Sequence, residues 1–297
     1  MASSITSTVV DLSRLPAPAI VALLDAETIL ADMMADLAAA GFTALVDSDP
    51  AVKLMQLTAY REQLLRQAFQ DAAQQLLVAY ASGANLDHLG ALVGVMRLVI
   101  VAADPVTGAD AVMETDDSLR QRIVLAPEAF SVAGPELAYV AHAKAASGDV
   151  LDASATSPAP GEVLVSVLSV VGDGTASPAL LDTVQAVVAD KAIRPLGDHV
   201  TTASAEIIPF AIDAALTAFS GPDVGIVLAA ARAGAAAYVA DCHKLGRNVR
   251  RAGLDAAMKV AGVENVVITT PAGDVLCDAT QAPHCTGILI THAGDAA

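Results

Sequence analysis

The chain has 297 residues, 55% of them hydrophobic but only 3% aromatic, and a formal net charge of −17 at pH 7. This length suffices for two or three modest domains with cores of their own, while so acidic a surface argues against binding to nucleic acids or anionic lipids. Three cysteines, an odd number without a CxxC pair, indicate reduced thiols and argue against a disulfide framework or a zinc site.

The N-terminal third is predicted to be helical. Residues 1–15 mix Ser, Thr and Val and are expected to be extended, and a helix is predicted over 19–40, before Gly41. Asp47-Ser48-Asp49-Pro50 is a strong N-cap pattern. It predicts the longest helix of the chain over residues 51–80.

Two neighbouring apolar stripes follow this long helix. One consists of Leu65, Phe69, Ala72, Leu76 and Ala79, and the other of Leu54, Leu57, Leu64 and Ala68. Together they form a face wider than one partner helix covers, as expected in a bundle of three or more helices. Periodicity alone fits an internal helix of the chain's own domain slightly better than an intermolecular bundle. Under the second interpretation the partner interface includes Leu54, Leu57, Leu65, Phe69 and Leu76.

The rest of the chain predicts an α+β fold, with strands appearing mainly after Pro127. The apolar segment that begins at Leu76 is predicted to stay helical up to Gly83. Further helices are predicted at 84–93, 119–126, 135–147, 178–193, 222–242 and 253–261. Strands are predicted at 98–103, 150–157, 162–171, 200–208, 212–219, 263–270 and 286–291, with Pro209 at an edge or a bulge.

These elements suggest a helical bundle region over residues 1–95, an extended connector with a short helix over 96–127, and α+β modules over 128–204 and 205–297. The two modules share a faint echo. Lys144…Gly148 followed by a Pro turn and Glu162-Val163-Leu164 is repeated as Lys259…Gly262, a Pro turn and Asp274-Val275-Leu276. The echo predicts two related helix, strand, turn, strand units.

No residues form a recognisable catalytic, metal or cofactor site. The loop Gly172-Asp173-Gly174-Thr175 follows a strand but lacks the lysine and the glycine spacing of a phosphate loop, so we expect a turn. The six histidines are scattered, and no GxSxG or HExxH motif occurs. We therefore expect neither an enzyme nor a bound cofactor or metal. A small-ligand-binding protein of the cytoplasm stays open as an alternative function.

One basic cluster stands out in this acidic chain: Lys244, Arg247, Arg250 and Arg251. Without interleaved aromatic residues the cluster is a weak signal for phosphate binding. A solvated turn, or a patch that meets an acidic partner, is the better interpretation. Among identical acidic copies such a patch would contact the acidic surface of a neighbour.

The hydropathy and the N-terminus bear on location. The mean hydropathy of +0.56 fits either an apolar face that another subunit covers or simply an Ala-rich composition. No charge precedes Asp11, and no apolar run reaches 18 residues. We therefore expect a protein made in the cytoplasm, without a signal peptide and without insertion into a membrane.

Several turn and helix-cap motifs carry a resemblance to a known family. They are Ala81-x-Gly83-x-Asn85-Leu86-Asp87-x-x-Gly90 with Arg97, Glu114-Thr115-Asp116-Asp117-x-x-Arg120-x-Arg122-Ile123, Thr156-Ser157-Pro158-x-Pro160-Gly161-Glu162-Val163, Gly172-Asp173-Gly174-Thr175, Val188…Arg194-Pro195-Leu196-x-Asp198-x-Val200 and Gln281-Ala282…Cys285-Thr286. Each motif is weak alone. In their order and spacing the chain resembles the baseplate J-like family of contractile phage tails, tailocins and related contractile injection systems.

The resemblance implies a structural wedge subunit of a baseplate, assembled in bacteria into a virion or tail particle. Two J-type copies would join one I-type wedge protein through the N-terminal bundle. Adjacent wedges would then form a ring that contacts the hub and the sheath initiator. Such a ring would pass the trigger for contraction to the sheath.

Overall fold

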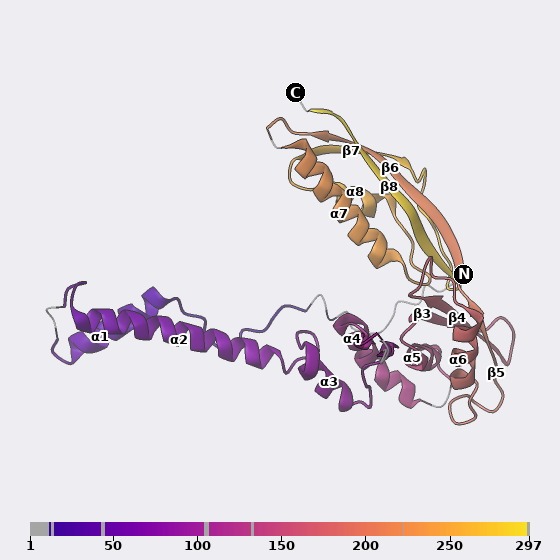
Figure 1. The fold of residues 1–297 in the computed structure, drawn as a ribbon, viewed down its shortest axis with the longest axis horizontal. Coiled ribbons are helices and arrows are strands. Elements are labelled where there is room, and N and C mark those ends of the chain that lie inside the picture. The colour runs from indigo at the N-terminus through magenta and orange to yellow at the C-terminus, as the bar shows by residue number, and fades with distance from the viewer. Residues whose placement is uncertain are drawn as a thin grey trace. The chain divides into compact units, whose positions relative to one another are not determined.

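The computed structural model describes residues 12, 15–42, 45–103, 107–131, 134–221 and 223–295 (Figure 1). The chain divides into two compact units. The first combines the residues up to Arg97 with Thr115–Val124, and the second combines Leu98–Glu114 with Leu125–Ala297. Helices come first and small mixed sheets with helices follow, which confirms the predicted α+β class.

The first unit contains four helices in the part of the chain that the structure describes: α1 (Ala26–Ala39), α2 (Pro50–Gln74), α3 (Gly83–Ala91) and α4 (Asp116–Leu125). The predicted cap of the long helix is confirmed, because the Asp49 carboxylate accepts a hydrogen bond from the Ala51 amide at 2.8 Å and Pro50 occupies the first turn. α1 packs against α2.

The helix predicted over 19–40 begins only at Ala26, and the prediction of its start was wrong. The reason is a clamp on the preceding backbone by the buried side chain of Gln70. Its Oε1 accepts from the amides of Ile20 (2.9 Å) and Val21 (3.2 Å), and its Nε2 donates to the Pro18 carbonyl at 2.6 Å. Backbone groups bonded to a side chain of α2 are held outside a helix of their own.

The long helix ends at Gln74, earlier than the predicted residue 80, and Gly83 opens α3 instead of ending the preceding helix. The chain between them forms successive turns, in which the Gln75 side chain accepts from the Ser82 amide (3.0 Å) and donates to the Tyr80 carbonyl (3.2 Å). These bonds replace the helical ladder. Leu76 and Ala79 therefore lie beyond the helix on whose stripe they were placed.

The motif residues of the first unit join α3 and α4. Arg97, 14% exposed, forms ion pairs with Asp87 at 2.8 Å and with Asp116 at 2.6 Å. The second oxygen of Asp116 accepts from the Gly83 amide at 3.0 Å. Arg120 donates to the carbonyls of Val78 and Ala81, both at 2.8 Å. The cluster beneath consists of Ala81, Leu86, Leu119 and Ile123.

The second unit begins with a short antiparallel pair, β1 (Val99–Val101) and β2 (Val112–Met113), and a 3₁₀ helix at Ala126–Phe130. A central module follows, made of α5 (Glu136–Ala146), β3 (Val150–Thr156), β4 (Glu162–Ser169), α6 (Pro178–Val188) and β5 (His199–Ser204). A C-terminal module contains β6 (Glu206–Ala218), α7 (Val224–Cys242), α8 (Arg251–Met258), β7 (Val263–Thr270) and β8 (Gln281–Asp295).

Each module is a three-stranded mixed sheet with two helices against it (Figure 1). In the central module the order is β3-β4-β5, with β3 antiparallel and β5 parallel to the middle strand. In the C-terminal module the order is β7-β6-β8, with β7 antiparallel and β8 parallel to the middle strand. The cores centre on valines such as Val165 and Val184, and on Ile212, Leu254 and Met258.

The two sheets therefore share their spatial pattern but not their chain order. The antiparallel strand precedes the middle strand in the central module and follows it in the C-terminal one. The echo also predicts a strand at Asp274-Val275-Leu276. These residues form no strand of the described sheet, since Val275 makes only an isolated bridge to Val249. The prediction of two sequential helix, strand, turn, strand units was wrong, because similar turn chemistry serves two different connections.

The strand predicted over 200–208 is two strands in two different sheets. The break falls at Ala205, whose amide donates to the Val167 carbonyl of the first sheet at 2.8 Å. The next amide, of Glu206, donates to Thr280 beside the second sheet at 3.0 Å. Pro209 lies next to a register shift at Phe210, where β6 pairs only with β8. The predicted edge or bulge at this proline is confirmed.

The last strand is longer than the predicted residues 286–291. The early part of β8 contains Pro283, a residue that is more typical of a turn than of a strand. However, β8 lies at the edge of the sheet. A missing amide is tolerated there. The Pro283 carbonyl is engaged on that side by Nδ1 of His243, at 2.7 Å.

We expect residues 127–297 to fold without the first unit, because they contain both module cores and exceed the size that a stable domain needs. The purified fragment should be soluble and should unfold in a single cooperative thermal transition by circular dichroism. A second fragment that begins at Leu98 and includes the β1–β2 pair provides the control. Aggregation of both fragments would contradict the prediction.

Acid should destabilise the first unit through Asp116. The hydrogen bond from the Gly83 amide, and then the one from Arg97, hold the pKa of this carboxyl below its usual range. A lowered folded pKa adds stability that is complete above the unfolded pKa of about 3.9 and is lost as the pH falls through the folded value. Urea unfolding at pH 7 and pH 3 should show that the free energy of unfolding falls less between these two pH values for Asp116→Asn than for the wild type. Equal losses would contradict this account.

Candidate assembly surfaces

The five residues predicted for a helical interface have large apolar side chains that lie uncovered. Leu54 is 66% exposed, Leu65 60% and Phe69 67%, and Leu57 and Leu76 are similarly exposed. Leaving several large apolar side chains close together in water is unfavourable, and large exposed apolar patches often mark interaction sites. Residues 54, 57, 65 and 69 are called the α2 leucine face below.

The α2 leucine face points away from α1. At about 100° per residue, these four residues span an arc of roughly 120°. The residues of α2 that are buried within the first unit are Val52, Ala59 and Gln70. By the same helical geometry, the centre of these buried residues lies roughly 150° around the helix axis from the centre of the α2 leucine face. One side of α2 is therefore packed within the first unit, and the described residues leave the opposite side exposed.

The basic cluster lies between α7 and α8 and is already paired within the C-terminal module. Lys244 and Arg247 share Asp241, at 3.0 and 3.1 Å, and Arg250 pairs with Asp274 at 2.7 Å. Four positive charges thus face two carboxylates. Lys244, Arg247 and Arg250 stay largely exposed, so a modest positive patch is left in an acidic chain.

Arg251 has a structural role instead. Its guanidinium donates to the carbonyls of Ile268 at 2.8 Å and Pro271 at 2.6 Å, and its amide donates to Asp274 at 2.9 Å. Both arms of the side chain are engaged in fixing the end of β7 to the start of α8. Of the four basic residues predicted for an interface, Arg251 is the one whose hydrogen bonds stabilise the fold of the C-terminal module.

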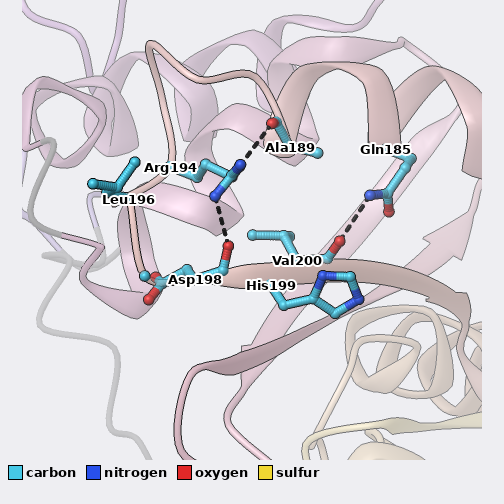
Figure 2. Close-up of a pocket in the computed structure, with 8 residues that line it drawn as sticks. Gln185, Ala189, Arg194, Leu196, Asp198, His199 and Val200 are labelled. Atoms are coloured by element: carbon cyan, nitrogen blue, oxygen red, sulfur yellow. Dashed lines mark hydrogen bonds between the residues drawn. The ribbon is translucent and has the colours of Figure 1, made fainter.

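A hollow of about 400 Å³ lies beside the loop between α6 and β5 (Figure 2). Arg194 donates to the carbonyls of Ala189 (3.1 Å) and Asp198 (2.8 Å), and Gln185 donates to Val200 at 2.8 Å. The Asp198 carboxylate accepts from the Tyr139 hydroxyl at 2.7 Å, and burial followed by this hydrogen bond raises the pKa of the tyrosine. The side chains of Arg194, Gln185 and Asp198 are thus engaged with the protein itself, which does not favour a small-ligand site.

The same loop carries Leu196, whose side chain is 99% exposed. Figure 2 shows it at the rim of the hollow. This exposure could not be predicted from the sequence, because Arg194-Pro195-Leu196-x-Asp198 indicates only a turn. Arg194 fixes that turn through its bonds to backbone carbonyls, so the exposed leucine is presented on a rigid loop.

The cysteines lie in the C-terminal module. Cys242 is buried and Cys277 and Cys285 are half-buried, all with free thiols, and burial raises the pKa of Cys277 to about 11. Within the residues described by the structure, no group of three or more His, Cys, Asp or Glu side chains is arranged to hold a metal ion. Burial also raises the pKa of Cys285, and thiols with raised pKa values such as Cys277 and Cys285 are poor nucleophiles at neutral pH.

Among the described residues one helix, α7, is long and apolar enough to cross a membrane by length and composition. It lies against β8 and α8, with Val227, Ala231 and Ala235 in the core of the C-terminal module. Gly234 permits a close approach to α8, since a Cβ there would lie 2.2 Å from the Ala257 carbonyl oxygen. This packing accounts for the apolar character of the helix on the side that faces the module.

Comparison with known proteins identifies the family. Residues 47–104 match the baseplate J-like N-terminal domain, residues 131–204 the baseplate J-like central domain, and residues 210–291 the baseplate J-like protein C-terminal domain. The chain is also 39% identical over 297 residues to baseplate protein J of Escherichia phage P2, covering 96% of this chain and 98% of that protein. The chain belongs to the baseplate J-like family.

A solved structure also resembles this baseplate J-like chain, the cryo-EM structure of the anti-feeding prophage baseplate, 6-fold symmetrised. The match has a TM-score of 0.41 and 16% identity, and it covers 58% of this chain and 42% of that chain. Family membership makes the chain a structural protein of a contractile-tail baseplate. The prediction of a structural rather than enzymatic protein is confirmed by this membership.

The different roles of the basic residues can be separated experimentally. Arg251→Ala should lower the free energy of unfolding by about 1–3 kcal/mol, because two carbonyls lose a charged hydrogen-bond donor. Neutralising the two residues that share one exposed carboxylate, with Lys244→Gln and Arg247→Gln, should change it by about 1 kcal/mol or less. Urea unfolding of both variants provides the measurement, and the reverse ranking would contradict this assignment.

Proposed function

We propose that this baseplate J-like chain is a wedge subunit whose α2 leucine face is buried in an intermolecular helical bundle. The bundle partners are an I-type wedge protein and a second copy of the chain. The observation that carries the proposal is the width of the apolar surface that α1 leaves uncovered on α2. The relation to baseplate protein J of phage P2 over nearly its full length supports a role in the same kind of assembly.

The energetics favour a bundle over a single helix pair. Burying the exposed part of the four large apolar side chains of the α2 leucine face contributes about 4–7 kcal/mol. Association of two proteins costs on the order of 4–15 kcal/mol in lost freedom of motion. The two ranges overlap, so this face alone gives marginal binding. A third helix that covers both sides of the arc, or further contacts by the modules, makes the complex stable.

Contacts between adjacent wedges are assigned to the second unit. The exposed Lys244 and Arg247 offer a positive patch to the acidic surface of a neighbouring copy, and Leu196 offers a rigid apolar point. Exposed ion pairs are worth about 0.2–1 kcal/mol each. Contacts of this size can be exchanged when the ring changes state, which fits a ring that passes the trigger from the hub to the sheath initiator and the sheath.

The alternative function, a cytoplasmic protein that binds a small ligand, has less support. A ligand site needs polar groups that converge on a cavity. Around the hollow of the central module, Arg194, Gln185 and Asp198 already bond to the protein.

The bundle is tested by placing charge on the α2 leucine face. Leu57→Asp combined with Leu65→Asp should reduce co-purification with a co-expressed I-type wedge protein by at least about 100-fold, since two buried charges replace two buried leucines. Gln56→Asp with Gln67→Asp adds the same charge to the polar side of α2 and is the matched control.

Circular dichroism and thermal unfolding establish that both variants keep the modules folded. Normal co-purification of the leucine variant would show that the exposed face has no part in assembly and would remove the basis of the proposal.

A further inference from the structure

A single positive charge lies in the middle of the α2 leucine face. Arg61 follows Leu54 by seven residues and precedes Leu65 by four, so the three side chains lie along one stripe of the helix. The Arg61 side chain is exposed. A helix that covered this face would therefore cover the guanidinium as well.

Arg61 differs from the other arginines of α2 and of the α3–α4 region. Arg66, one turn further along, is paired with Glu62 at 2.6 Å, and Arg97 and Arg120 have carboxylate partners. Arg61 forms no ion pair or hydrogen bond with any residue in the described ranges. Covering an unpaired guanidinium with apolar groups is strongly unfavourable, so the covering helix must supply a counter-charge.

A second copy of α2 supplies this charge poorly. A parallel copy in register would place Arg61 against Arg61. An antiparallel copy can place Arg61 against Asp71, because both lie five residues from Arg66. In that arrangement Leu57 would meet position 75, which is past the end of α2 at Gln74. Leu54 and Leu57 would then stay uncovered.

We infer that the α2 leucine face selects a helix of a different protein, one that carries an aspartate or glutamate among apolar residues at the level of Arg61. The inference rests on the proposed bundle and adds the chemistry of the partner to it. The leucines provide affinity, and the single charge pair fixes which helix binds and in which register, since a shift by one turn would leave both charges unpaired.

Charge reversal in the complete tail tests the inference. Arg61→Glu should reduce the yield of assembled tails, counted by electron microscopy, at least about tenfold, and Arg61→Lys should keep most of it. Lys53→Glu makes the same charge change at an exposed position near the start of α2 and should leave the yield unchanged. Second-site mutations that restore assembly of the Arg61→Glu variant should lie in a helix of another tail protein. They should replace an aspartate or glutamate there with lysine or arginine.

The outcomes are distinct. Suppressors at Asp71 of this chain would overturn the inference in favour of antiparallel self-pairing. A normal yield of tails from Arg61→Glu would also overturn the inference. If the leucine double variant still blocked assembly in that case, the proposed bundle would stand without the charge pair.

A second measurement uses the purified chain alone. Arg61→Leu makes the face continuously apolar and should increase self-association at least about tenfold by sedimentation equilibrium, because the repulsion between copies is removed. Unchanged self-association would count against the role of Arg61 in keeping the α2 leucine faces of two copies apart. With that role, the second copy of the proposed bundle packs beside the helix of the I-type protein rather than on this face.

Discussion

The structure depends on one constraint, which is that α2 has two apolar sides and the residues that the structure describes cover only one of them. α1 and the backbone clamped by Gln70 occupy the first side. The α2 leucine face lies opposite and stays in water. Under the proposed bundle, a chain of this kind is completed only in the assembly, because its longest helix is shared with a partner. This explains how a sequence with a mean hydropathy of +0.56 and few aromatic residues can serve in an assembly.

The motif residues that resemble the family act on the fold rather than on a reaction. Arg97 and Asp116 connect the start of α3 with the start of α4, and Arg194 fixes the loop before β5. Such residues hold surfaces rigid without spanning an active site. Rigid surfaces of this kind suit a structural baseplate protein, whose work is to present contact surfaces in fixed positions.

Much of the fold could be predicted because local signals agreed with the tertiary structure. The cap at Asp49, the strand β7 at Val263–Thr270 and the change to mixed sheets were all predictable from local patterns. The errors arose where distant groups decide the backbone. Gln70 holds residues 18–21 outside α1, and two consecutive amides at Ala205 and Glu206 bond to partners at different sheets. For the candidate surfaces, residue type revealed the leucines but not the exposure of Leu196 or the pairing of the basic cluster.

The most direct test of the central claim is the accessibility of the α2 leucine face before and after assembly. Leu65→Cys would be labelled with a maleimide in the free chain and in intact tails, with peptide-resolved mass spectrometry to separate it from the native cysteines. We predict labelling at least about tenfold slower in the intact tail, because the face is then buried. Equal labelling rates in the free chain and in intact tails would contradict the account.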